Sequence, residues 1–280
     1  MHKILISLLL LPQIALSSVL PKQLAVPGGI VNIKLGSVAI PAPEVLFQGK
    51  RVLVLENEHQ WYAVVGIPLN TKAGKHAVQV KSEGLNEKRS FNIVDKDYPA
   101  QYITIKNKRM VNPNPVDLER ISSERPAINK ALNTWTEQPV EDILFSIPVQ
   151  GRLSSPFGLK RFFNNQPKNP HSGLDIAAPT GTAINASAPG LVINTGSYYY
   201  NGNTVFLDHG QGLVTGYFHM SKISVKAGQI VEQGTKLGEV GETGRVTGPH
   251  LHWNVYLNKT KVDPALFVPE LCVKQTEDAQ

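Results

Sequence analysis

Cysteine is nearly absent from this 280-residue chain, in which Cys272 stands alone. A lone thiol excludes internal disulfide bonds, and it also excludes a closed structural zinc site built from thiolates. Because Cys272 has no partner and lies near the C-terminal end, we assign it no role beyond that of a small apolar side chain.

Long hydrophobic runs are also scarce, and after the first residues none has the length of a membrane-spanning helix. The one early run, Ile4–Leu11, is too short to span a bilayer, and it lies between basic Lys3 and the small-residue pattern Ala15–Ser17. This arrangement predicts a secretory signal peptide over residues 1–17, and no cysteine near the cleavage point suggests a lipid anchor. We therefore expect an exported protein of the periplasm or cell envelope without a transmembrane segment.

Runs of basic residues are missing, although the net charge is +6 and the pI is near 9.3. The charge favours an acidic partner, such as an anionic cell-wall polymer or lipid. Without a basic run or an aromatic and basic cluster, nucleic acid is not expected. Hydrophobic residues make up 41% of the chain and charged residues 18%, which indicates folded domains, and the length favours two of them.

Residues 20–95 contain short β-type runs separated by turn residues such as Pro27-Gly28-Gly29. Their alternation and spacing predict a small antiparallel β-sandwich. The runs are Val31–Leu35, Arg51–Leu55, Trp61–Val65, Ala77–Val80 and Ser90–Val94.

A connector is expected over residues 96–146. Asn114 followed by Pro115 is typical of a helix start, because asparagine caps the helix and proline needs no hydrogen-bond partner at the first position. Pro126 is expected to kink or divide this helix. An apolar stripe follows the helical period and predicts packing against one of the two domains, with partner binding as the alternative. The stripe is Leu118, Ile121, Ile128, Leu132 and Trp135.

Residues 147–268 form a second predicted β-domain, followed by a tail at 269–280. Its clearest strands are Thr204–Asp208, Leu213–Phe218 and His250–Leu257. In the last of these the side chains alternate between faces, so His250 and His252 project from the same face, roughly 6 to 7 Å apart.

His171 and Asp175 are about 13 Å apart if the chain between them is extended, which is too far to share one ion. A bend at Ser172-Gly173 would bring both onto a metal. With His252 they form three ligands and leave a position for water, the pattern of a catalytic zinc site with one Zn²⁺ per chain.

Five of the eight histidines fall between His171 and His252, which strengthens the case for a metal site. One of them, His209, matches no ligand spacing and is expected to be structural.

Four segments of this domain resemble the successive motifs of the lysostaphin-type zinc endopeptidases, the M23 peptidases that cut peptidoglycan cross-bridges. They are Ser155–Gly158, His171–Asp175, Tyr217–His219 and Gly241–His252. The resemblance implies a mainly β, antiparallel catalytic domain, and residues 20–95 resemble the immunoglobulin-like accessory domain that precedes some of these enzymes.

Carried over by position, the resemblance implies that His171, Asp175 and His252 bind zinc, while His219 and His250 serve catalysis. Asn254 departs from the family pattern, in which many members carry an acidic residue there, and this affects the surroundings of the ligands rather than the ligands themselves.

The implied function is an exported zinc metalloendopeptidase that hydrolyses peptide cross-links of peptidoglycan. One of the two catalytic histidines takes a proton from water, and the other steadies the oxyanion or protonates the leaving amine; the sequence leaves this division open. The resemblance favours D-alanyl-to-diaminopimelate cross-links, with pentaglycine bridges as an alternative. Intramolecular regulation, in which the N-terminal domain covers the groove, is a separate hypothesis that no motif in the sequence demonstrates.

Two other functions are compatible with parts of the sequence. A non-catalytic peptidoglycan-binding or amidase-activator module of the same fold would have lost metal ligands, whereas every ligand position here is filled. The segment Val225–Gly238 resembles part of a lipoyl or biotinyl carrier, but the signal peptide argues against a cytoplasmic carrier, and we expect a structural hairpin there.

Overall fold

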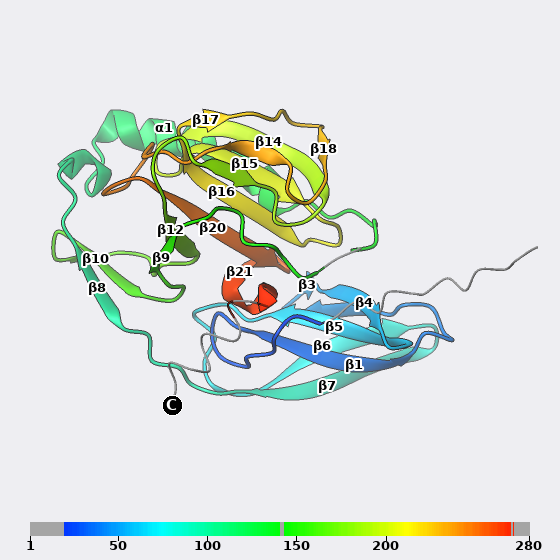
Figure 1. Ribbon diagram of the computed structural model, residues 1–280. Helices are drawn as coiled ribbons and strands as arrows, with labels where there is room; N and C mark the ends of the chain where they lie inside the picture. The colour runs from blue at the N-terminus through cyan, green and yellow to red at the C-terminus, as the bar shows by residue number, and fades with distance from the viewer. Residues whose placement is uncertain (1–19, 141–142, 270, 272–280) are drawn as a thin grey trace, which may run out of the picture.

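The computed structural model describes residues 20–140, 143–269 and 271 (Figure 1). The predicted signal peptide and Cys272 lie outside the described residues. Within this part of the chain, no helix has the length and apolar character needed to cross a membrane.

The first domain is the predicted sandwich of two antiparallel sheets, which confirms the expected mainly β class. Phe47 and Ala63 are among the residues buried between the sheets. One sheet has the order β1-β5-β4, with β1 (Ile30–Ser37), β4 (Leu53–Asn57) and β5 (Gln60–Gly66). The other has the order β3-β2-β6-β7, with β2 (Glu44–Phe47), β3 (Lys50–Arg51), β6 (Gly74–Ser82) and β7 (Leu85–Ile93).

The connector contains a strand as well as the predicted helix. It runs through β8 (Ala100–Ile103), a 3-10 helix (Lys108–Met110) and α1 (Pro115–Leu132). Helix α1 begins where expected, because the Asn114 side chain accepts a hydrogen bond from the Asp117 backbone N–H at 2.9 Å. The Asp117 carboxylate in turn accepts from the Asn114 N–H at 3.2 Å, which completes a capping box.

Pro126 does not divide α1, so that part of the prediction is wrong. The helix continues from Pro115 to Leu132 with Pro126 inside it. Both Pro126 and Ser122, whose carbonyl loses its helical partner, are exposed, so water can satisfy the freed carbonyl.

The apolar stripe of α1 packs on the second domain only in its C-terminal half. Ile128 and Leu132 contact a buried aromatic cluster that includes Phe206 and Phe218, whereas Leu118 is 55% exposed.

The second domain is built on one large antiparallel sheet with the order β18-β14-β15-β16-β20-β12-β9, and β21 pairs with β20. The strands are β9 (Arg152–Ser155), β12 (Leu174–Ala177), β14 (Gly190–Tyr198), β15 (Gly202–Asp208), β16 (Val214–Met220), β18 (Ile230–Val231), β20 (His250–Leu257) and β21 (Thr260–Val262). A 3-10 helix, Pro264–Phe267, follows β21.

Two three-stranded sheets flank the large one. The first has the order β13-β19-β17, with β13 (Ala183–Asn185), β17 (Lys222–Ile223) and β19 (Lys236–Glu239). The second has the order β11-β10-β8, with β10 (Lys160–Phe163) and β11 (Gln166–Pro167). Strand β8 of the connector pairs in parallel with β10, so the connector contributes a strand to the second domain.

The segment Val225–Gly238 is not a hairpin, which corrects the prediction. Its two short strands do not pair with each other: β18 joins β14, and β19 joins β13 and β17. Strand β19 lies between β13 and β17, so both of its edges are already paired and neither is open to β18.

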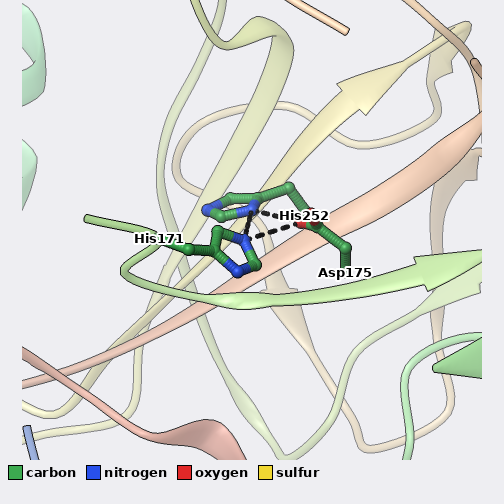
Figure 2. Close-up of side chains that lie close together, drawn as sticks. All are labelled: His171, Asp175 and His252. Carbon is green, nitrogen blue, oxygen red and sulfur yellow. Dashed lines mark hydrogen bonds and ion pairs between the residues drawn. The ribbon is translucent and has the colours of Figure 1, made fainter. Parts of the chain in front are cut away.

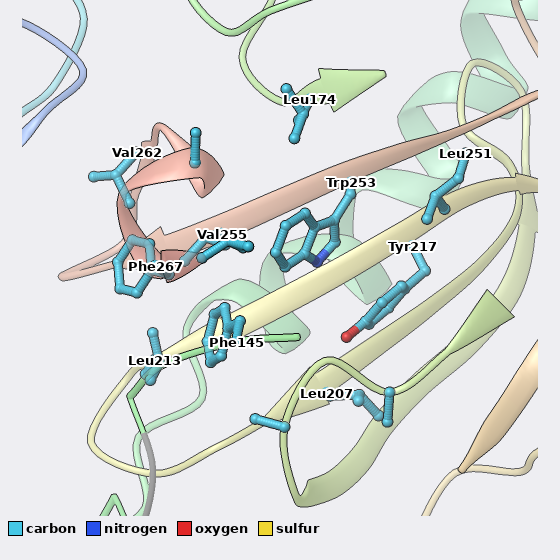
Figure 3. Packing of buried hydrophobic residues seen from close by; sticks show 14 of the residues in the cluster. Phe145, Leu174, Leu207, Leu213, Tyr217, Leu251, Trp253, Val255, Val262 and Phe267 are labelled. Carbon is cyan, nitrogen blue, oxygen red and sulfur yellow. The ribbon is translucent and has the colours of Figure 1, made fainter. Parts of the chain in front are cut away.

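The two domains share a hydrophobic core. Leu53 and Val64 of the first domain belong to the same buried cluster as Trp253 and Leu257 of the second, and Figure 3 shows Trp253 at the centre of the second domain's contribution. The contact requires Gly66, since a Cβ atom there would lie 2.9 Å from Asn258 Oδ1 and 3.0 Å from the Leu257 side chain.

Asn258 stabilises this contact between the two domains by hydrogen bonding. It is 3% exposed, its Oδ1 accepts from the Gly66 N–H at 2.8 Å, and its Nδ2 donates to the Gly66 carbonyl at 3.0 Å. The side chain thus pairs with the backbone of a strand in the other domain.

Candidate metal centre and groove

Strand pairing brings the predicted ligands together. Asp175 on β12 lies directly opposite His252 on β20 in the antiparallel register. His171 precedes β12, and the chain bends at Gly173 between them, as the spacing predicted. Glycine suits this bend because a Cβ atom would lie 2.7 Å from the His252 ring and 2.1 Å from Asn254 Oδ1.

The three side chains point toward one another (Figure 2). His171 Nε2 lies 3.0 Å from both Asp175 Oδ1 and His252 Nδ1, and His252 Nδ1 lies 2.6 Å from Asp175 Oδ1. Three such electron-pair donors are held close together while their residues are largely buried, so the set fits a divalent metal ion that accepts nitrogen and oxygen ligands.

Backbone contacts fix His171 for this role. Its Nδ1 lies 2.7 Å from the Pro156 carbonyl, and because a carbonyl only accepts, Nδ1 must carry the proton and Nε2 presents a lone pair. The Gly158 N–H donates to the His171 carbonyl at 2.7 Å, and the His171 N–H donates to the Leu159 carbonyl at 2.8 Å. Pro156 and Gly158 of the Ser155–Gly158 motif thus hold the ring and the backbone of His171 in place.

Asp175 is held from two sides. Its Oδ1 faces the histidines, while its Oδ2 accepts from Arg161 Nη2 at 2.8 Å. Burial opposes ionisation of this carboxyl, but the neighbouring His252 and His171 outweigh it and hold the pKa of Asp175 well below its usual value. Arg161 also donates through Nε to Gln101 on β8, at 3.2 Å, so the connector supports this arrangement.

His219 reaches the site through an irregularity of β16. The register between β15 and β16 shifts across this region, and His219 has a positive φ of 64°. Tyr217 and Met220 both lie in the main core, whereas a regular strand would place them on opposite faces. The extra residue turns His219 out of that core, with its ring centroid 5.0 Å from that of His250 and 6.0 Å from that of His252.

His219 and His250 contact the backbone through the same ring nitrogen as His171 does. Each Nδ1 lies 2.8 Å from a backbone carbonyl, that of Thr243 for His219 and that of Gly248 for His250. Each Nδ1 therefore donates to its carbonyl, which selects the tautomer in which the neutral ring has its lone pair on Nε2. His250 Nε2 lies 3.8 Å from Asp175 Oδ1, next to the ligand set.

Burial keeps two of these imidazoles neutral. It lowers the pKa of His219 well below 6.5, and the neighbouring His250 and His252 add to the effect. Burial also lowers the pKa of His252 to about 4, although Asp175 opposes the shift. Both rings are thus in the unprotonated form that coordination or proton acceptance needs at neutral pH.

A groove of about 370 Å³ joins these residues. His219, His250 and His252 line it together with Asp175 and, from the connector, Gln101. A larger hollow of about 630 Å³, between the sandwich and the connector, shares no lining residue with it, and we favour the smaller groove because the histidines lie there.

The structure thus brings together all five predicted site residues: His171, Asp175, His219, His250 and His252. It places His209 elsewhere, buried between the Pro189 carbonyl at 2.6 Å and Thr215 Oγ1 at 2.8 Å. Asn254 is also buried, and its Nδ2 donates to the Tyr256 hydroxyl at 2.9 Å.

Groove residues that were not predicted include Gln101, Arg161 and Arg245. Arg245 lies within the Gly241–His252 motif, only five residues before His250, so its place in the sequence was a signal that could have found it. Gln101 and Arg161 depend on the pairing of β8 with β10, which no short motif reports.

Comparison with known proteins agrees with this geometry. The sequence profile of peptidase family M23 matches residues 169–264, and that of the M23 N-terminal domain matches residues 23–96. A crystal structure described as a putative peptidase M23 from Pseudomonas aeruginosa has 42% sequence identity and a TM-score of 0.75, and the alignment covers 88% of this chain and 95% of that one.

Two curated relatives match less than half of this chain. Peptidoglycan DD-endopeptidase ShyA of Vibrio cholerae is 40% identical over 120 residues, which are 42% of this chain and 28% of that protein. DD-carboxypeptidase/endopeptidase Mpg of Neisseria meningitidis is 42% identical over 126 residues, 44% of this chain and 29% of that protein. The matched stretches span less than a third of either relative. From the two family profiles and the near full-length likeness to the Pseudomonas protein, the chain belongs to peptidase family M23 and carries that family's N-terminal domain ahead of its peptidase domain.

Proposed function

We propose that this protein is an exported zinc endopeptidase that hydrolyses peptide cross-links of peptidoglycan. The observation that carries the proposal is the convergence of three ligand atoms, from His171, Asp175 and His252, beside two further imidazoles in one groove. A set of three protein ligands suits a catalytic rather than a structural metal site.

His171 would bind zinc through Nε2, Asp175 through Oδ1 and His252 through Nδ1. When bound, zinc lowers the pKa of a coordinated water toward neutrality and polarises a substrate carbonyl. Arg161 keeps Oδ1 of Asp175 directed at the metal by engaging Oδ2, and the Pro156 carbonyl keeps His171 in the tautomer that ligation needs.

His219 and His250 supply the proton transfers. Each has an Nε2 lone pair facing the groove and an Nδ1–H anchored on the backbone, so each is oriented to accept a proton at Nε2 and return it from the same atom. Peptide hydrolysis needs one proton removed from water and one delivered to the leaving amine. We assign these steps to the pair as a unit.

Peptidoglycan is the proposed substrate because the curated relatives named above include a peptidoglycan DD-endopeptidase and a DD-carboxypeptidase/endopeptidase. The bond we propose is the D-alanyl-to-diaminopimelate cross-link. A net charge of +6 is compatible with an anionic polymer.

We further infer that the N-terminal part of the chain acts on the groove through the connector. Gln101, Ile103 and Ile105 line the groove, whereas none of the described residues before residue 96 does. The residues of β8 and the loop after it thus give the N-terminal part of the chain a direct contact with the groove, in addition to the core that the first domain shares with β20.

The proposal is tested on purified cross-linked peptidoglycan, with zinc, with a chelator and with His252→Ala, by mass spectrometry of the released fragments. We expect chelator-sensitive loss of cross-linked dimers that His252→Ala does not produce, and the fragment masses identify the bond. If the zinc-loaded protein binds peptidoglycan but releases nothing, the proposed hydrolysis is rejected in favour of a binding or activator role.

A further inference from the structure

Arg245 lies in the groove with its charge uncompensated. Among the described residues, no carboxylate forms an ion pair with its guanidinium, and no acceptor receives a hydrogen bond from it. Asp175, the carboxylate among the groove-lining residues, is already engaged by Arg161 and the histidines. A guanidinium carries five N–H donors, so those of Arg245 remain available.

Two aromatic rings hold this guanidinium in place. Its central carbon lies 4.4 Å from the ring centroid of Tyr200 and 4.8 Å from that of Phe163. Such contacts with ring faces are favourable for a cation and leave the N–H groups at the guanidinium edge free to bind a ligand.

The backbone of Arg245 is also fixed. Its N–H donates to the Tyr200 carbonyl at 2.9 Å, and the preceding Gly244 has a φ of +77° and packs so closely that a Cβ atom would lie 2.5 Å from the Gly202 nitrogen. The side chain is therefore presented from a rigid loop that leads directly to His250.

A partly buried cation without a counter-ion is unfavourable in the free protein. Burial lowers the pKa of Arg245, and nearby Arg161 adds to the effect. An arginine that served only as packing would extend its charged end into water, whereas this one lies beside the proposed catalytic histidines.

We propose that Arg245 receives a carboxylate of the peptide substrate and thereby selects cross-linked peptides that carry a free carboxylate near the scissile bond. This inference rests on the proposed peptidase function. A planar guanidinium held at its faces matches the two oxygens of a carboxylate. Near the scissile bond of a cross-linked stem peptide, two carboxylates are candidates: the one at the end of the peptide and the one on the side chain of diaminopimelate.

The test measures binding, so that it does not depend on turnover. Full-chain His219→Ala protein is titrated with three synthetic cross-linked peptides: one unmodified, one amidated at its terminal carboxyl and one amidated at the diaminopimelate side chain. We expect one of the two amides to bind about 10- to 100-fold more weakly than the unmodified peptide, and that amide identifies the source.

Adding Arg245→Gln should weaken binding of the unmodified peptide by the same factor and abolish the preference between carboxylate and amide. Arg245→Lys should restore part of the preference, because it keeps the charge but not the planar two-point contact. Arg152→Gln removes one positive charge from an exposed position outside the groove and should leave the preference intact.

Equal binding of the three peptides, no binding of any, or a preference that persists in Arg245→Gln would overturn the proposal. Failure of the proposed function has a different signature, since wild-type protein would then leave the cross-link intact while still preferring the carboxylate. Should Arg245→Gln fail to fold, the three-peptide series and Arg245→Lys still decide the matter.

Discussion

Arg161 and Asp175 form an ion pair in which Arg161 takes the carboxylate oxygen that the histidines leave free. Oδ2 of Asp175 accepts from Arg161 at 2.8 Å, and Oδ1 lies 2.6 Å from His252 Nδ1. The arginine comes from β10, which is held in turn by β8 of the connector. The orientation of one predicted metal ligand thus depends on chain that lies outside the segment matched by the peptidase profile.

Replacing this arginine should weaken metal binding without removing a ligand. We expect Arg161→Gln to lower zinc affinity by about 10- to 100-fold, because the Asp175 carboxylate loses its orienting partner. Competition with a chromophoric chelator measures the affinity. Lys160→Gln, an exposed neighbour on the same strand, is the matched control, and an affinity in Arg161→Gln equal to that of this control would contradict the prediction.

Measuring both metal content and reaction rate distinguishes a residue that binds the metal from one that transfers protons. His219→Ala should retain one zinc per chain and lose about 10²- to 10⁴-fold in rate, because it removes a proton-transfer group but no proposed ligand. His252→Ala should lose both. Metal analysis of the purified variants, beside release of cross-linked dimers, checks this; equal metal loss in the two variants would refute the assignment.

The metal-free protein should lose stability as pH falls through the acid range. The pKa of His252 is about 4 in the fold and 6.5 as its ordinary value, so between these values the unfolded chain binds a proton that the folded chain does not. This contribution is fully present above pH 6.5 and decreases by about 3 kcal/mol as the pH falls to about 4.

Denaturant unfolding at several pH values in the presence of a chelator measures the slope. His252→Gln should flatten it, although His219, whose pKa is lowered in the same direction, keeps part of the dependence. A wild-type slope unchanged by His252→Gln would contradict the assignment.

Asn258→Ala should destabilise the fold by about 2 to 4 kcal/mol, because it leaves the buried N–H and carbonyl of Gly66 without partners. Asn92→Ala, at an exposed position of β7, should change stability by no more than about 0.5 kcal/mol. Chemical denaturation of both variants provides the comparison, and similar losses in the two would show that the Asn258 pair contributes little.

Local sequence patterns correctly predicted several elements of this fold. Alternation along His250–Leu257 predicted a strand whose apolar residues enter the core and whose histidines face the other way, and β20 has these bounds. The Asn114-Pro115 pair predicted the start of α1, because helix capping is decided within a few residues.

The sequence predictions failed where the structure is determined by pairing between residues far apart in the chain or by exposure to solvent. Strand β8 exists through its pairing with β10, some 60 residues away, so Gln101 could not be connected with Arg161 from the sequence. The turn of His219 out of the core depends on an irregular register with β15, which a two-residue period does not reveal. Pro126 stays within α1 because its surroundings are open to water.

The shared core has a thermodynamic consequence. Since Leu53 and Val64 are buried together with Trp253 and Leu257, separating the domains would expose apolar surface on both, and neither is expected to melt independently. We expect one calorimetric transition for the whole chain, with equal calorimetric and van't Hoff enthalpies, where two autonomous domains would give two. A fragment that begins at residue 146 would expose this surface and would lack β8, so we expect the peptidase domain to fold and unfold together with the rest of the molecule.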